Sequence, residues 1–305
     1  MTGRRERSSR SEPLEVKSAQ GLKRNTVTST QILMKTARGC ILGSIIAVLL
    51  GCDIQKNMLY YPGSYTIADI RRYTAENDLL LWPGPDGGYQ GIVSRKGPAN
   101  FKGTIVIFHG NGGPAIFRTY YLAALEARGY RVVLAEYPGY GGRSGELSEQ
   151  SFVADARRAA LRAKGEFGGP LYLWGESLGC GVASALAADK ELRPQGVVLL
   201  TPWDSLLGIA KAQFPWLPVK LFLSDRYDNV ANLDAYGGPV AVILSGRDEI
   251  IPNKLTMRLY HALSPPKRMW TFENAGHNDW PSHPELDWWD EVMDFLNTGG
   301  ERSGP

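Results

Sequence analysis

The sequence predicts an α/β protein with a mostly parallel central sheet that is covered by helices on both faces. Short apolar runs alternate with segments of helical length between residues 104 and 296. The run Thr104–Phe108 is continuously apolar and β-branched, which is typical of a strand buried on both faces. With 305 residues, 43% hydrophobic content and 21% charge, the chain is long enough for one large core.

The predicted elements follow one another along the chain. Two early pieces are expected to be antiparallel strands of a mixed sheet: Leu79–Trp82 and Gly91–Val93. The later strands are expected at Thr104–Phe108, Arg131–Ala135, Leu171–Trp174, Val197–Leu200, Val240–Leu244 and Met269–Phe272. Helices are expected at Tyr120–Ala127, Ser148–Ala163, Cys180–Ala188, Asn253–Leu263 and Glu285–Leu296. Active sites in such sheets lie at the carboxyl ends of the strands.

An insert at about residues 203–236 interrupts this alternation between two central strands. It is rich in aromatic side chains and carries Pro215 and Pro218. Two interpretations stay open at this point. The insert is either a small helical cap that overhangs the site or a segment whose rings pack it onto the body.

The most informative motif is Gly175-Glu176-Ser177-Leu178-Gly179, which stands between a predicted strand and a predicted helix. In that context the pattern G-x-S-x-G indicates a sharp turn that exposes a nucleophilic serine. The flanking glycines leave room for strained backbone angles at Ser177. Ser177 is therefore the candidate nucleophile.

A serine hydroxyl needs a base, and imidazole is suited to remove its proton. His277 lies in a turn-rich loop directly after the last predicted strand, at the edge where the serine turn opens, and is the predicted base. His261 falls inside a helix and His283 lies beyond the loop. His109 ends the Thr104–Phe108 strand and is expected to be structural.

Asp248 is the predicted acid that orients the imidazole and stabilises its charged form. It follows the Val240–Leu244 strand through a short turn. Glu249 is adjacent but is expected to point elsewhere. Asp204, after the preceding strand, is the alternative acid.

The glycine-rich stretch His109-Gly110-Asn111-Gly112-Gly113 follows a buried strand and is the candidate oxyanion hole. The backbone amides of Asn111 and Leu178 are the predicted donors to the developing negative charge. The alternative is a glycine run that only turns the chain. No metal-binding spacing is present, and no metal or organic cofactor is expected.

The amino-terminal region carries the basic excess of the chain. Residues 1–51 hold nine Lys and Arg against three Glu, whereas the remainder holds 25 basic and 28 acidic residues. The nearly neutral remainder gives no support for nucleic-acid binding. A short apolar run, residues 41–50, follows Lys35 and Arg38 and resembles a secretory signal too short to span a bilayer.

That run ends in Leu49-Leu50-Gly51-Cys52, which resembles a bacterial lipobox and implies cleavage before Cys52 and lipid attachment to its thiol. A plain signal anchor, or a cleaved peptide with an incidental cysteine, is the alternative. The polar residues 1–33 are expected to be a disordered extension, with Met34 as the true start of a signal at 34–51. Residues 52–62 would then be an anchor linker, residues 63–298 the folded domain, and 299–305 a tail.

Several motifs converge on one resemblance, which spans Met58 to Leu296. The chain resembles a compact α/β-hydrolase of the serine-peptidase/thioesterase-like branch, which includes membrane-associated depalmitoylases. The features that carry it are His109-Gly110-Asn111-Gly112, Tyr137-Pro138-Gly139-Tyr140-Gly141, the serine motif, Leu217-Pro218, Asp225-Arg226-Tyr227-Asp228, Gly246-Arg247-Asp248 and Gly276-His277. The order Ser177, Asp248, His277 also matches the order of nucleophile, acid and base in α/β-hydrolases. The resemblance implies that Tyr137–Ser144 lines the pocket, that Leu217-Pro218 belongs to a cap helix and that Asp225–Asp228 braces the cap.

Together these features predict an exported, membrane-anchored lipoprotein of a bacterial cell envelope that hydrolyses esters or thioesters of small or acyl substrates. Its partners would be a small-molecule acyl substrate and, through the lipid, a membrane surface, without nucleic acid. Two alternatives remain. One is a peptidase or amidase of the same fold, and the other is a non-catalytic binding lipoprotein.

Overall fold

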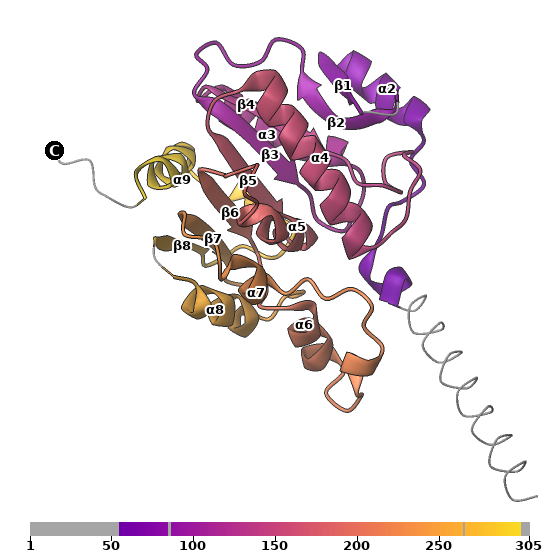
Figure 1. The fold of residues 1–305 in the computed structure, drawn as a ribbon, viewed down its shortest axis with the longest axis vertical. Helices are drawn as coiled ribbons and strands as arrows, with labels where there is room; N and C mark the ends of the chain where they lie inside the picture. Colours follow the sequence, from indigo (N-terminus) through magenta and orange to yellow (C-terminus); the bar gives the residue numbers. More distant parts are fainter. Residues whose placement is uncertain (1–54, 85–86, 265, 300–305) are drawn as a thin grey trace, which may run out of the picture. The chain divides into compact units, whose positions relative to one another are not determined.

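The structure is a computed structural model that describes residues 55–84, 87–264 and 266–299, all within the compact unit Ala47–Pro305. These residues build one eight-stranded sheet with the strand order β1-β2-β4-β3-β5-β6-β7-β8 (Figure 1). The strands are β1 Leu79–Pro83, β2 Tyr89–Ser94, β3 Gly103–Phe108, β4 Tyr130–Ala135, β5 Leu171–Glu176, β6 Gly196–Leu200, β7 Val240–Ser245 and β8 Lys267–Phe272. The strand pairs β1–β2 and β2–β4 are antiparallel, and every other pair in this sheet is parallel. The predicted mixed, mostly parallel sheet is confirmed.

Helices connect the strands as expected. They are α2 Ile67–Glu76, α3 Tyr120–Glu126, α4 Glu149–Phe167, α5 Leu178–Ala187, α6 Leu206–Gln213, α7 Asn229–Leu233, α8 Asn253–Ala262 and α9 Leu286–Thr298, with 3-10 turns η1 Ala115–Arg118, η2 Val219–Leu221 and η3 Trp280–Ser282. Residues 55–59 are also helical. Helix α2 was not predicted, and it begins with a capping box between Thr66 and Asp69. No helix within the described ranges has the length and apolar character needed to cross a membrane.

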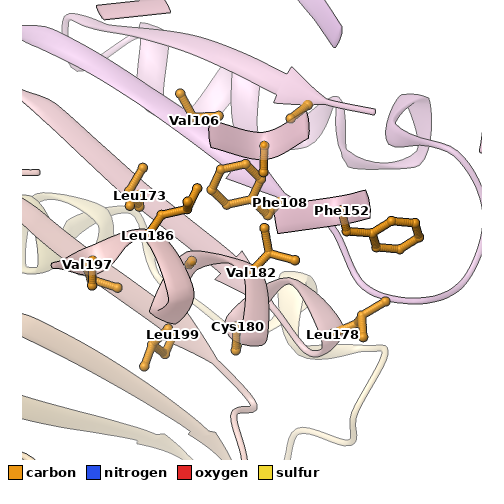
Figure 2. Packing of buried hydrophobic residues seen from close by; sticks show 14 of the residues in the cluster. Val106, Phe108, Phe152, Leu173, Leu178, Cys180, Val182, Leu186, Val197 and Leu199 are labelled. Atoms are coloured by element: carbon orange, nitrogen blue, oxygen red, sulfur yellow. The ribbon is translucent and has the colours of Figure 1, made fainter. Parts of the chain in front are cut away.

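The core consists of two layers, one on each face of the sheet. Val106 and Phe108 of β3 belong to the layer under α4, α5, α7 and α8. Ile105 and Ile107, the alternate residues of the same strand, belong to the layer under α2, α3 and α9. This two-sided burial explains why the strand is apolar at every position, since each buried side chain contributes roughly 1.5–3 kcal/mol. Figure 2 shows the first layer, where Val182 and Leu186 of α5 pack close to Phe108.

The insert combines a packed base with an exposed tip. Trp203 at its start and Tyr227 in its second half are 2% and 0% exposed. Between them, the segment after α6 projects away from the sheet (Figure 1) and exposes Trp216. The expectation of a cap helix at Leu217-Pro218 is wrong, because α6 ends at Gln213 and these two residues precede the short turn η2. The physical reason is that Pro215 and Pro218 lack the amide proton that a continuing helix needs.

Candidate active site

Ser177 occupies the turn between the end of β5 and the start of α5. Its backbone angles are φ 51° and ψ −113°, a strained conformation for a residue with a Cβ atom. The amide of Ser177 donates a 2.9 Å hydrogen bond to the carbonyl oxygen of Leu200 at the end of β6. This bond fixes the turn to the neighbouring strand, at the carboxyl edge of the sheet.

The two motif glycines are required by close backbone approach. A Cβ on Gly179 would lie 1.9 Å from the carbonyl oxygen of Phe108, and a Cβ on Gly175 would lie 2.4 Å from that of Gly179. Backbone atoms of β3 and α5 cannot move aside without breaking the core. The pattern G-x-S-x-G therefore follows from how tightly the helix approaches the sheet.

His277 and Asp248 complete a continuous line of hydrogen bonds with Ser177. The Nε2 atom of His277 lies 2.9 Å from Ser177 Oγ, and its Nδ1 atom lies 2.8 Å from Asp248 Oδ2. The imidazole and carboxylate side chains are only 6% and 2% exposed. With the ring proton on Nδ1, the imidazole donates to Asp248 and its Nε2 accepts the hydroxyl proton of Ser177.

The loops that carry the acid and the base are held by their own hydrogen bonds. The second carboxylate oxygen of Asp248, Oδ1, accepts from the amides of Ile250 and Ile251 at 2.9 and 2.7 Å. Glu249 bonds the backbone of His277 rather than its imidazole, because its carboxylate accepts from the backbone amide of His277 at 3.2 Å. The loop after β7 thus orients the imidazole through Asp248 and anchors the backbone of the next loop through Glu249.

The alternative residues lie elsewhere. Asp204 accepts from the amide of Ser205 and pairs with Arg258 at 3.4 Å, rather than with His277. His109 is buried and its Nε2 lies 3.0 Å from the carboxylate of Glu136. His261 is exposed on α8, and His283 lies 3.6 Å from Asp279.

The glycine-rich loop lies directly beside the serine. A Cβ on Gly110 would lie 3.5 Å from the Cβ of Ser177. Leu178 is the first residue of α5, so its amide has no partner within that helix. Within the described part of the chain, neither this amide nor that of Asn111 donates to another protein group. Neither N–H group therefore has a protein acceptor among the described residues, and a helix N-terminus favours negative charge.

Two tyrosines fix the backbone of this loop from either side. Tyr137 donates its hydroxyl proton to the carbonyl oxygen of His109 at 2.8 Å. Tyr140 donates to the carbonyl oxygen of Asn111 at 2.8 Å, and its hydroxyl oxygen accepts from the amide of Tyr61 at 3.1 Å. Both tyrosines belong to the Tyr137–Ser144 stretch, which the resemblance assigned to the pocket lining. In the structure these two hydroxyls support the loop.

Arg118 was not predicted from the sequence, although it connects both parts of the site. Its Nε and Nη2 atoms donate to the carboxylate of Glu176, which precedes the serine, and its Nη1 atom donates to the carbonyl oxygen of Gly112. Burial alone would raise the pKa of the Glu176 carboxyl, but Arg118 and the Tyr120 hydroxyl outweigh it and hold this pKa below its ordinary value. No sequence pattern marks Arg118, since it reaches Glu176 only through the fold.

The segment that precedes the predicted domain also contacts the site. Residues 55–62, assigned to the anchor linker, bond to the loop through the backbone of Tyr61 and to the insert through Tyr60. The Tyr60 hydroxyl donates to Asp225 at 2.7 Å and lies 3.1 Å from the hydroxyl of Tyr227. Asp225 also accepts from the amide of Glu149 at the start of α4. The aromatic cluster Met58–Pro62 was the available signal for this packing.

A sequence model of the α/β hydrolase fold matches residues 103–229, the part that contains the serine turn and the glycine-rich loop. The sheet order and the connections of the described residues agree with that fold. The chain has the α/β-hydrolase fold. No group of His, Cys, Asp and Glu side chains in the described ranges is arranged to hold a metal ion.

Particular relatives extend this result. Uncharacterized protein Rv2307c of Mycobacterium tuberculosis is 37% identical over 241 residues, which cover 76% of this chain and 82% of that protein. Lysophosphatidylserine lipase ABHD12 of Xenopus tropicalis is 26% identical over 213 residues, covering 62% of this chain and 54% of the lipase. This chain therefore matches only about half the length of that lipase.

Solved structures show the same fold. TT1662 from Thermus thermophilus has a TM-score of 0.53 and 25% sequence identity, over 69% of this chain and 93% of that chain. The Pyrococcus furiosus esterase PF2001 has a TM-score of 0.58 and 18% identity, over 78% of this chain and 96% of the esterase. The second likeness concerns the fold alone.

Proposed function

We propose that this protein is a serine hydrolase that cleaves carboxylic ester or thioester bonds. The observation that carries the proposal is the unbroken line of hydrogen bonds from Ser177 through His277 to Asp248. Such a line activates a hydroxyl that is otherwise a weak nucleophile. All three side chains are buried enough to be fixed in place, while Ser177 keeps 9% of its surface exposed.

The chemistry follows from these positions. Ser177 Oγ attacks the carbonyl carbon while His277 Nε2 takes its proton, and Asp248 stabilises the resulting imidazolium. The amides of Asn111 and Leu178 donate to the negative oxygen of the tetrahedral intermediate. The imidazolium returns its proton to the leaving alcohol or thiol as the acyl bond breaks. Water, deprotonated by the same imidazole, then releases the acid from the acyl-enzyme.

Esters are favoured over amides as substrates. The insert carries apolar rings rather than groups suited to binding a peptide backbone, and its buried Tyr227 packs at Gly181 of α5, the helix that follows Ser177. A relative named as a lipase supports the same preference. A peptidase or amidase would use the same three side chains, so the bond that is cleaved must be determined by experiment.

The decisive experiment compares wild type with Ser177→Ala on esters, thioesters and amides that share one acyl group, over a series of acyl lengths. We expect wild type to hydrolyse the ester and thioester, and a fluorophosphonate probe to label Ser177. Ser184→Ala is a matched control, because Ser184 is a buried serine of the same helix α5. Full ester hydrolysis by Ser177→Ala would overturn the assignment, and faster cleavage of the amide would favour the peptidase.

As part of this proposal, the protein is held at a membrane of a bacterial cell envelope by lipid on Cys52. Cys52 lies outside the described residues, so its support is the sequence motif Leu49–Cys52. Two or more acyl chains would give a stable anchor, since each buried methylene contributes about 0.8 kcal/mol. Metabolic labelling with an alkyne fatty acid should mark wild type and not Cys52→Ser. Equal labelling of both would exclude this site.

A further inference from the structure

The tip of the insert exposes an unusual amount of apolar surface. Trp216 and Leu221 are 78% and 72% exposed, and Leu217 and Phe222 are each 36% exposed. Single exposed apolar side chains are ordinary, but four within seven residues form a patch of the kind that marks an interaction site. We call these four residues the apolar tip.

The apolar tip has a defined backbone. The amide of Leu217 donates to the carbonyl oxygen of Phe214 at 3.1 Å, and that of Leu221 donates to the carbonyl oxygen of Pro218 at 3.0 Å. Val219 is only 6% exposed and holds the turn η2 against the body. The outward direction of the larger side chains is therefore set by the fold, with Val219 as the inward anchor.

The chain that leads toward Cys52 emerges at the same place. Gln55 accepts hydrogen bonds from the amide and hydroxyl of Ser224, two residues after the apolar tip, at 2.7 and 3.1 Å. Met58, one helical turn later, is 50% exposed. Cys52 is three positions before Gln55 in the sequence. Because an extended chain spans at most about 3.6 Å per position, the two residues cannot be more than about 11 Å apart.

The charge of the tip favours an anionic surface. Between Phe214 and Leu223 the only charged residue is Lys220, and it is exposed. A cationic side chain beside exposed tryptophan and leucine is the composition that binds at a lipid interface, where the apolar groups enter the acyl region and the cation meets the headgroups. A protein partner would be expected to meet a patch with a polar rim instead.

We propose that the apolar tip, together with Met58, inserts into an anionic lipid leaflet, so that the site takes acyl esters that reside in a membrane. Tyr227, five residues after the apolar tip, packs on helix α5, which begins directly after Ser177, so the leaflet would lie close to the site. The substrate part of this inference rests on the proposed function. The docking part rests on the exposure and charge of the tip and on its connection to the proposed anchor at Cys52, and it does not require the proposed catalytic activity.

Tryptophan fluorescence tests the docking directly in the full chain. Six of the eight tryptophans are buried, and Trp216 is the most exposed of them all. The emission difference between wild type and Trp216→Phe therefore reports on this side chain, while phenylalanine keeps the tip apolar. With vesicles of phosphatidylethanolamine and brominated phosphatidylglycerol, we expect the difference emission to shift to the blue and to be quenched by bromine. Unchanged quenching by aqueous iodide with and without vesicles would overturn the proposal.

A second experiment separates docking from catalysis. The tip variant carries both Trp216→Glu and Leu221→Glu. Its rate of hydrolysis of a short soluble ester should be unchanged, whereas its rate on a long-chain ester in the same vesicles should fall by about tenfold or more. The matched control is Leu286→Glu, at a side chain that is 77% exposed at the start of α9, away from the insert (Figure 1).

The outcomes are distinguishable. Absence of soluble-ester hydrolysis in wild type would overturn the proposed function. Intact soluble-ester hydrolysis, with equal rates on vesicles for wild type and the tip variant, would overturn docking alone. A wild-type dimer in solution that the tip variant abolishes would also overturn it, because the tip would then be covered by a second copy.

Discussion

The backbone of Tyr61 is paired with the backbone of Asn111. The amide of Tyr61 donates to the carbonyl oxygen of Asn111 at 3.0 Å, and the carbonyl oxygen of Tyr61 accepts from Gly113 at the same distance. The side-chain amide of Asn111 in turn donates to the carbonyl oxygen of Leu59. A segment just after the predicted anchor thus supports the loop proposed to hold the oxyanion.

Tyr140→Phe tests this support. Its hydroxyl joins the amide of Tyr61 to the carbonyl oxygen of Asn111, so its loss should let the loop shift. We expect kcat for a soluble ester to fall roughly tenfold, less than the 10²–10³ typical for a lost direct donor, with KM little changed. Tyr61→Phe is the control, because its hydroxyl bonds only the carbonyl oxygen of Met58 on the exposed side. An unchanged kcat in Tyr140→Phe would contradict the role.

Asp248→Asn should lower kcat by about 10³–10⁴, because an amide would favour the wrong imidazole tautomer while leaving the loop geometry in place. Asp204→Asn, at the alternative acid, removes a carboxylate that does not contact His277 and should change kcat by less than about threefold. Steady-state kinetics on one ester, with circular dichroism to check folding, measures both. The reverse ranking of the two variants would make Asp204 the acid.

Arg118→Met should destabilise the protein by roughly 3–5 kcal/mol, because it leaves the carboxylate of Glu176 buried without its cation. The two side chains are only 14% and 12% exposed. Arg72→Met breaks an exposed pair with Asp69 and should cost about 1 kcal/mol or less. Urea unfolding compares the variants. Adding Glu176→Gln to Arg118→Met should restore part of the loss, and no restoration would argue against the pair as its cause.

Stability should depend on the charge of Glu176 at acid pH. The pKa of this carboxyl is lowered from its ordinary value of 4.5, so its ionised form contributes stability that is complete above that value. The contribution is lost as the pH falls from there through the lowered pKa. The gap in unfolding free energy between wild type and Glu176→Gln should therefore be widest near neutral pH and should narrow below about pH 4. If the unfolding free energies of the two proteins changed in parallel across that pH range, ionisation of Glu176 would not contribute to stability.

Much of the fold could be predicted because its signals are local. Every predicted strand has a counterpart within a few residues, since β-branched apolar runs buried on both faces leave little choice of structure. Helix α2 was not predicted, although Ile67, Ile70 and Tyr73 recur at helical spacing and a capping box marks its start. For the insert, the sequence left open whether its rings pack on the body or overhang the site. The structure buries Trp203 and exposes Trp216, which depends on tertiary packing.

The sequence by itself determined the sheet, the strained serine turn and the candidates Ser177, Asp248 and His277. These features could be predicted because turn glycines and strand ends are recognised from residues that are adjacent in the chain. Only the tertiary structure decided that these three side chains lie within hydrogen-bond distance. It alone also brought Arg118 to Glu176 and Tyr61 to Asn111. Contacts between residues far apart in the chain depend on how separate strands align, and no local pattern encodes that alignment.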